Sequence, residues 1–339
     1  MKKLITLILA IPVSVVAIAQ NSDSSSFYFK KGLEEKSAKR YLVASNYYTK
    51  AIELNPHYVD AYIENGYANK EMRKTDASKQ DFTKALELDP QNEVAITELM
   101  DLYFNYRQYQ NAINMAQKCK TCVNKDMVIA MSYFNLEDYG KAEKLLLALV
   151  NKSPKDAEAT YTLARNYLEM GLEAKAIPWY VKAVQLDETK SKWLFELGLL
   201  YYNNSNYKSA VIYFNKAAEQ GYTRGNDFNE NLGFAYVYSG DYENGEKLLQ
   251  DIIARKPGDK ELIMDVATAF YDSKKYDKSL DYCQKILELD MKDGKALYQA
   301  GLCFQKKGQV ERGMLMCDKA IELDPSLAGL KSKKLSPGM

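Results

Sequence analysis

The residues with the clearest chemical potential are Cys119 and Cys122, which enclose Lys120 and Thr121 in a C-x-x-C motif. Two cysteines at this spacing can form a local disulfide in an oxidising compartment, and the same spacing also serves thiol–disulfide exchange. Attachment of haem would require a histidine after the second cysteine, and Val123 occupies that position. Three alternatives stay open for the pair: a structural disulfide, two packed thiols, or a catalytic dithiol.

Chemistry that depends on histidine has little support in this chain. The only histidine is His57, which follows Pro56 in an expected loop between helices. A histidine-containing metal cluster therefore cannot be assembled within one chain, and a histidine-based catalytic triad would depend on this single side chain. The P-loop, G-x-S-x-G, H-E-x-x-H and calcium-loop patterns are also missing from the sequence. These observations predict a protein that is not an enzyme and that holds no cofactor or metal.

The elements that must position these residues follow a period of 34 residues. In each copy a small residue is followed twelve positions later by a second small residue. A bulky or apolar residue comes four positions after the second small residue, a further residue comes three positions later, and a proline often comes five positions after that. The first two copies consist of Gly32, Ala44, Tyr48, Ala51 and Pro56, and of Gly66, Ser78, Phe82, Ala85 and Pro90. Nine copies span residues 25–327, and the third copy, which ends at the C-x-x-C motif, is four residues short.

This pattern resembles the tetratricopeptide repeat family, whose unit is a helix-turn-helix of about 34 residues. The resemblance implies an all-α fold, a right-handed α-solenoid of about nine repeats, in which neighbouring repeats stack because none buries its apolar face alone. The expected repeats are 25–58, 59–92, 93–122 (shortened), 123–156, 157–190, 191–225, 226–259, 260–293 and 294–327. A flexible leader over 20–26 and a C-terminal cap or tail over 328–339 are expected to flank them.

The sixth repeat illustrates how the two helices of a repeat are expected to pack. Small side chains at Gly198 and Ala210 let the helices approach closely, while Tyr201 and Phe214 fill the space beside them. Between the paired helices, glycines recur at equivalent positions, where a left-handed residue ends a helix at little cost. These glycines are Gly171, Gly240 and Gly308.

The resemblance places the second, fifth, ninth and twelfth residues of each repeat on the concave surface, where ligands of this family usually lie. Two groups of these residues are rich in aromatic or flexible apolar side chains. The methionine stretch comprises Phe104, Met127, Met131 and Phe134, and the aromatic stretch comprises Phe195, Leu199, Tyr202 and Phe234. Tyr161 and Arg165 occupy the same kind of position between them in the sequence. Such side chains either pack between adjacent helices or bind a partner, and both interpretations stay open.

Cys283, Cys303 and Cys317 fall at internal positions of the last two repeats. By the geometry that the resemblance implies, Cys303 faces the second helix of the preceding repeat, which carries Cys283. A disulfide between these two repeats is one alternative, and buried cysteines that act as small apolar side chains are the other. Five cysteines cannot all pair within one chain.

Residues 1–19 have the pattern of a secretory signal, with two lysines, an apolar run, and small residues at Ala17 and Ala19. We expect cleavage after Ala19, which makes Gln20 the first mature residue. An uncleaved membrane anchor is the alternative, but the apolar run is shorter than the roughly 20 residues of a spanning helix. The pattern predicts export to the periplasm, with secretion as a second destination, and no stable membrane insertion once the signal is removed.

The composition favours a protein or peptide as the partner. The formal charge of +1 becomes −1 when the two lysines of the signal leave, so the chain has no strong attraction for nucleic acid. The expected groove mixes aromatic, aliphatic and charged side chains, which suits a protein interface. We therefore predict a non-enzymatic scaffold of the bacterial cell envelope that binds a protein or peptide partner in its groove. Because aromatic side chains also stack on sugars, recognition of glycan or peptidoglycan is the alternative.

Overall fold

The computed structural model describes residues 13–329, with side chains from residue 24 onward. Over this range the chain forms eighteen α-helices and one short 3-10 helix, and it forms no strand. The described part of the fold is therefore all-α, as the resemblance implied.

The chain divides into two compact units, an N-terminal unit that ends at Leu172 and a C-terminal unit that begins at Glu173. The helices of the N-terminal unit are α1 (Val13–Ser37), α2 (Tyr41–Leu54), α3 (Val59–Glu71), α4 (Thr75–Leu88), α5 (Glu93–Asn105), α6 (Tyr109–Lys118), α7 (Lys125–Asn135), α8 (Tyr139–Lys152) and α9 (Ala157–Glu169). Those of the C-terminal unit are α10 (Glu173–Leu186), α11 (Ser191–Asn203), α12 (Tyr207–Glu219), α13 (Asn226–Ser239), α14 (Tyr242–Arg255), α15 (Lys260–Asp272), α16 (Tyr276–Leu289), α17 (Gly294–Lys306), α18 (Val310–Leu323) and the 3-10 helix η1 (Pro325–Leu327). The division falls between α9 and α10, inside the expected fifth repeat.

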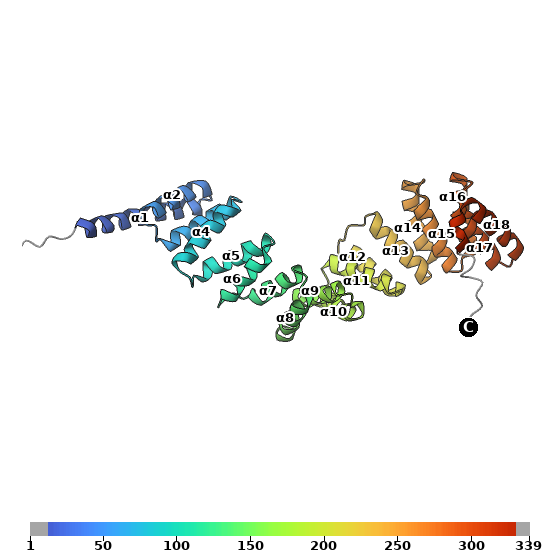
Figure 1. The fold of residues 1–339 in the computed structure, drawn as a ribbon, viewed down its shortest axis with the longest axis horizontal. Helices are drawn as coiled ribbons and strands as arrows, with labels where there is room; N and C mark the ends of the chain where they lie inside the picture. The colour runs from blue at the N-terminus through green and yellow to red at the C-terminus, as the bar shows by residue number, and fades with distance from the viewer. Residues whose placement is uncertain (1–12, 330–339) are drawn as a thin grey trace, which may run out of the picture. The chain divides into compact units, whose positions relative to one another are not determined.

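Within each unit, consecutive helices pack side by side in pairs (Figure 1). In the N-terminal unit α1 packs on α2, α3 on α4 and α5 on α6. First helices of neighbouring pairs also touch, as α1 does with α3 and α7 does with α9. In the C-terminal unit the same contacts join α11 to α13, α13 to α15 and α15 to α17. Each unit is therefore a stretch of α-solenoid, which the stacking of neighbouring helix pairs stabilises.

The close approach of paired helices depends on a small residue opposite a large one. Gly198 lies on α11, and a Cβ atom added there would fall 2.6 Å from a ring carbon of Phe214 on α12. The Phe214 ring is fully buried, so it has no free space to move into. The expected packing of Gly198 against Phe214 is thereby confirmed. Tyr201 stacks on Tyr213 across the same helix pair, with the ring centroids 5.4 Å apart.

The turns within the helix pairs share one backbone feature. Gly171, Gly240 and Gly308 have φ angles of 71°, 98° and 85°, which confirms the expected left-handed turns. The equivalent position of the six other expected repeats is also left-handed but holds a larger residue. These residues are Lys39, Arg73, Arg107, Glu137, Ser205 and Lys274, with φ between 57° and 61°. Because such a residue costs about 1 to 2 kcal/mol in this conformation, packing of the flanking helices must maintain these turns.

The prediction of a flexible leader over 20–26 is wrong, because these residues are helical and belong to α1. Ser25 is buried there, and α1 packs against α2. Packing therefore outweighs the weak helix propensity of the serines in this segment.

Two other expectations concern the chain ends. Residues 1–12 of the expected signal lie outside the described residues, and residues 13–19 form the start of α1. The expected tail lies outside the described residues from position 330 onward. Among the helices that the structure describes, none combines the length and the apolar character needed to cross a membrane.

Candidate functional site

The methionine stretch lies on two helices of the N-terminal unit. Phe104 belongs to α5, and Met127, Met131 and Phe134 belong to α7. All four side chains are half-buried, so each packs against the solenoid and still reaches solvent. Phe104 packs against the core cluster that contains Met100, which fixes one end of the stretch.

Arg165 of α9 supplies a positive charge beside the methionine stretch. Its guanidinium carbon lies 5.2 Å from the centroid of the Phe134 ring, a cation–π distance. Arg165 Nη2 also lies 3.6 Å from Glu169 Oε1. The guanidinium is therefore held over the ring between an aromatic face and a carboxylate.

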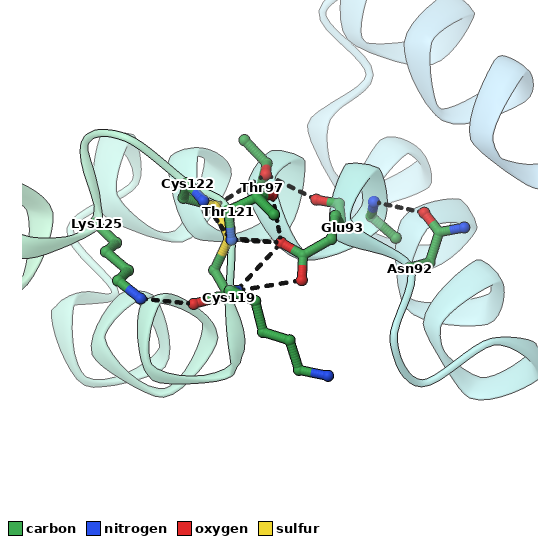
Figure 2. The surroundings of a disulfide bond; sticks show 9 residues. Asn92, Glu93, Thr97, Cys119, Thr121, Cys122 and Lys125 are labelled. Atoms are coloured by element: carbon green, nitrogen blue, oxygen red, sulfur yellow. Dashed lines mark hydrogen bonds between the residues drawn. A yellow bond between two sulfur atoms is a disulfide. The ribbon is translucent and has the colours of Figure 1, made fainter.

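The loop between α6 and α7 joins the shortened third repeat to the fourth and contains the C-x-x-C motif. Cys119 caps the C-terminus of α6 and is buried, while Cys122 is half-buried. The two sulfur atoms form a disulfide. Figure 2 shows this bridge beside Glu93, the first residue of α5. Of the three alternatives that the sequence left open, the structure therefore contains the disulfide.

Glu93 holds this loop through several hydrogen bonds (Figure 2). Its carboxylate accepts from the backbone N–H of Lys120 at 3.1 Å, from that of Thr121 at 3.2 Å and from the Thr121 hydroxyl at 2.9 Å. Although desolvation opposes ionisation, these donors lower the pKa of Glu93. On the other side, Lys125 Nζ donates to the carbonyl oxygen of Cys119 at 3.0 Å. The loop is therefore attached both to α5 and to the start of α7.

The carboxylate of Glu93 also affects the chemistry of the bridge. Glu93 Oε2 lies 3.0 Å from Cys119 Sγ. A thiolate at Cys119 would stand beside this negative charge and at the C-terminus of α6, and both disfavour it. Because exchange proceeds through thiolates, this environment favours a structural bridge over a catalytic dithiol.

The same three residues bring potential metal ligands together. Glu93, Cys119 and Cys122 each place a ligand atom within 4.8 Å of the others. Cysteine ligates metals as a thiolate, and the two sulfur atoms are bonded to each other. In its disulfide form this cluster therefore offers a metal only the carboxylate, which is already occupied by the hydrogen bonds of the loop.

The aromatic stretch lies on α11 and α13 of the C-terminal unit. Phe195, Leu199 and Tyr202 of α11 are half-buried. Phe234 of α13 is only 9% exposed and belongs to a core cluster, and Tyr161 of the N-terminal unit is only 8% exposed. Packing is therefore the correct interpretation for Phe234 and Tyr161, which leave a partner little surface to contact.

A cluster of rings surrounds Phe195. Its ring stacks on Tyr222 with the centroids 4.4 Å apart and lies 5.6 Å from the rings of Phe214 and Phe228. Phe195, Leu199 and Tyr222 help to line a pocket of about 450 Å³. The rest of the lining is mostly polar and includes Thr223, Asn226, Asp227 and Asn231. An apolar floor with a few polar groups is typical of ligand sites.

Carboxylates from α13 and α15 lie near Tyr202. Burial, helped by neighbouring tyrosines and by the charges of Glu230 and Asp265, raises the pKa of Tyr202. Desolvation and the charges of Asp227 and Asp265 raise the pKa of Glu230, and Lys256 opposes this shift. The aromatic stretch therefore faces negative charge, whereas the methionine stretch has a cation beside it.

The three remaining cysteines are buried thiols in the C-terminal unit. Cys303 Sγ donates a hydrogen bond at 3.2 Å to Ser279 Oγ on α16, the helix that also carries Cys283. The expected orientation of Cys303 is confirmed, but no disulfide joins it to Cys283. Burial raises the pKa of Cys283 to about 12, and Cys317 packs in a core cluster. These cysteines act as small apolar side chains.

Three residues of these sites were missed by the sequence analysis: Glu93, Tyr222 and Asp265. Glu93 opens the third repeat and is 26 residues from Cys119, so no short spacing connects them. Tyr222 lies near the end of the sixth repeat, which is one residue longer than its neighbours, and that extra residue was the one signal available. Asp265 lies next to an expected groove position and carries no signal of its own.

The stacked helix pairs define the class of this protein as a helical repeat protein. Family models described as Tetratricopeptide repeat match most of the chain. One matches residues 127–191 and 231–294, and another matches residues 25–58, 59–92, 193–220 and 294–327. The chain belongs to the tetratricopeptide repeat family.

Two curated proteins resemble parts of this chain. Protein O-mannosyl-transferase TMTC1 of Homo sapiens is 31% identical over 165 residues, which cover 48% of this chain and 18% of that protein. A TPR repeat-containing protein of Methanocaldococcus jannaschii is 24% identical over 190 residues, which cover 53% of this chain and 32% of that protein. The chain therefore spans a third or less of the length of these relatives.

Solved structures of tetratricopeptide repeat proteins resemble parts of this chain. The C-terminal part of a TPR repeat-containing protein from Cytophaga hutchinsonii is 20% identical, with a TM-score of 0.48, and the match covers 70% of this chain and 98% of that one. YrrB, described as a TPR protein with an unusual peptide-binding site, is 24% identical, with a TM-score of 0.40, and the match covers 56% of this chain and 98% of that one. The likeness concerns the fold alone.

Proposed function

We propose that this protein is a non-enzymatic scaffold of the bacterial cell envelope that binds a protein or peptide partner along its concave face. Tetratricopeptide repeats serve as interaction surfaces, because stacked repeats line an extended face with side chains from many helices. The binding residues in this proposal are the methionine stretch with Arg165 and the half-buried members of the aromatic stretch. Tyr161 and Phe234 support them from the core.

The observation that carries the proposal is the partial exposure of Met127, Met131 and Phe134 on α7. These large apolar side chains are half-buried, although a solvated helix face would more cheaply hold polar residues there. Methionine adapts its shape to a partner, and the guanidinium of Arg165 over Phe134 adds a hydrogen-bond donor at the edge of the apolar surface. The combination is typical of an interface centre, where aromatic residues, Met and Arg are enriched.

The proposal includes export to the periplasm, with secretion as the second destination. The pattern of residues 1–19 supports it. Mass spectrometry of the protein from the producing cell should show a mature chain that begins at Gln20. Recovery of the full-length chain in washed membranes would contradict export by a cleaved signal.

The binding proposal is tested by cross-linking in intact cells, followed by capture of the wild-type protein and of a Met131→Ala/Phe134→Ala variant. We expect the variant to lose a stoichiometric envelope partner that the wild type retains, because truncation at an interface centre commonly costs about 2 kcal/mol or more. A Leu42→Ala/Val43→Ala variant is the matched control, since these apolar side chains are exposed on α2, a second helix of its pair.

The outcomes of the capture experiment and of a glycan-binding assay distinguish the candidate functions. Equal capture of the partner by wild type and by the Met131→Ala/Phe134→Ala variant would refute the role of the methionine stretch. Binding of the wild type to isolated peptidoglycan or polysaccharide, without a protein partner, would instead favour the glycan alternative.

A further inference from the structure

The part of the C-terminal unit that carries the aromatic stretch is also rich in carboxylates, and this combination restricts the kind of partner that fits. Asp227 and Glu230 lie on α13, and Glu261 and Asp265 lie on α15. Asp227, Glu261 and Asp265 are exposed, and Glu230 is half-buried. Because Asp227 also lines the pocket formed by Phe195 and its neighbours, the apolar and acidic surfaces are continuous.

Cations lie near these carboxylates but do not pair with them. Within the part of the chain that the structure describes, Asp227, Glu230, Glu261 and Asp265 form no ion pair. Lys292 and Lys295 line a pocket with Glu261 and Asp265, and Lys256 acts on Glu230. Lys260 lines the same pocket and pairs with Asp290 at 3.0 Å and with Asp293 at 2.9 Å. Lys260 is thus already neutralised by two other carboxylates.

Burial and the neighbouring carboxylates both disfavour the charged forms of Glu230 and Asp265. Desolvation, Asp227, Asp265 and Asp259 raise the pKa of Glu230. Desolvation, Glu261 and Asp259 raise the pKa of Asp265. A cation placed among them would relieve this repulsion, whereas an anion would increase it.

We infer that the aromatic stretch binds a basic segment of a protein partner, with an apolar or aromatic side chain in the pocket lined by Phe195, Leu199 and Tyr222 and with Lys or Arg side chains against Asp227, Glu230 and Asp265. This inference rests on the proposed function and names the chemistry of the partner at the C-terminal unit. The pocket of about 450 Å³ is large enough for one side chain.

The polar rim of the pocket fits a peptide backbone. Asn226 and Asn231 line it beside Thr223. Asn226 Oδ1 accepts from Arg255 and Asn231 Nδ2 donates to the Asp227 carbonyl oxygen, which leaves the Asn226 Nδ2 donor, the Asn231 Oδ1 acceptor and the Thr223 hydroxyl for a peptide backbone. The guanidinium carbon of Arg224 lies 5.6 Å from the centroid of Phe228, a ring that lines the pocket, so this ring already has a cation beside it. Basic side chains of the partner are therefore placed against the carboxylates, and an apolar side chain is placed against the rings.

The test measures the affinity of the full-length mature protein for two labelled synthetic peptides by fluorescence anisotropy. The first is a twelve-residue peptide of Phe, Leu and Lys, and the second replaces every Lys with Glu. We expect the basic peptide to bind at least about tenfold more tightly than the acidic one, with an affinity that falls as salt rises.

The variant Glu230→Gln/Asp265→Asn should lose most of this preference, by about tenfold in the affinity for the basic peptide. Its matched control is Glu219→Gln/Asp251→Asn, which removes the same charge from exposed residues of α12 and α14 and should leave the affinity unchanged. Thermal unfolding of both variants checks that the amides preserve the fold.

Either of two results would overturn the inference: a basic peptide that binds no more tightly than the acidic one, or an affinity unchanged by Glu230→Gln/Asp265→Asn. Failure of the proposed function gives a different signature, because it appears as capture of the native partner that is unaffected by Met131→Ala/Phe134→Ala. If that capture is lost while the charge variant binds the basic peptide normally, the scaffold function stands and only the inference about basic partners falls.

Discussion

The methionine stretch and the aromatic stretch occupy equivalent positions of their repeats but differ in the charge beside them. Arg165 lies over Phe134 in the N-terminal unit, whereas Glu230 and Asp265 act on Tyr202 in the C-terminal unit. The residue types at these positions are free to vary, because they serve no packing role common to all repeats. One solenoid framework can therefore present surfaces of opposite charge.

The two stretches also differ in how they are supported. The methionine stretch depends on a loop that a disulfide closes internally and that Glu93 attaches to α5. The aromatic stretch depends on ring packing, in which Phe195 contacts three other rings. The first support is covalent and electrostatic, and the second is apolar, so different perturbations should affect them.

The largest expected effect comes from removing one ring from each stretch. Phe195→Ala should destabilise the C-terminal unit by about 3 kcal/mol, because it leaves a cavity among Phe214, Tyr222 and Phe228. Phe134→Ala should cost the N-terminal unit only about 1 kcal/mol, since this ring contacts mainly Tyr139 and Arg165. Hydrogen exchange of the full chain, read over α11–α13 and over α7–α9, gives both values. Equal losses would remove the distinction between the two supports.

A smaller effect is expected on the reduction of the disulfide. A thiolate of dithiothreitol attacks the half-buried Cys122, and Cys119 leaves as a thiolate beside Glu93; the second thiol of the reagent then closes its ring and completes the two-electron reduction. Glu93→Gln removes the charge 3.0 Å from Cys119 Sγ, so reduction should become about tenfold faster. Mass spectrometry after quenching with an alkylating reagent measures the rate.

The control for this prediction is Thr121→Val, which removes one hydrogen bond to Glu93 and keeps the negative charge. Its rate should stay close to that of the wild type. If Thr121→Val accelerates reduction as much as Glu93→Gln does, loosening of the loop explains the effect and the electrostatic interpretation is wrong. Peptide affinity at the aromatic stretch should not change on reduction in any variant, because the C-terminal unit has no disulfide among its described residues.

The smallest effect concerns a feature that both units share. Arg107→Gly in the N-terminal unit and Lys274→Gly in the C-terminal unit should each stabilise the protein by about 0.5 to 1 kcal/mol, because both residues have positive φ. The midpoint of urea unfolding measures the gain. Lys216→Gly inside α12 is the control and should lose about 1 kcal/mol. A gain in one unit alone would indicate that the turns are not equivalent.

The repeat framework was predictable because each of its features recurs every 34 residues. Gly198 opposite Phe214 and the left-handed Gly171 follow from positions that the period aligns. The leader was not predictable from composition, since serines near Ser25 become helical when α1 packs on α2. For Tyr161 and Phe234 the sequence left packing and partner binding both open, and the structure shows them buried.

The amino-acid sequence by itself determined the helix pairs and their turns, because these depend on spacings within one repeat. Only the tertiary structure decided that Glu93 meets the loop of Cys119, and that Tyr222 stacks on the ring of Phe195. These contacts join neighbouring helices through residues that occur once and obey no period. Their partners are therefore fixed by how the repeats stack, and no local spacing reveals them.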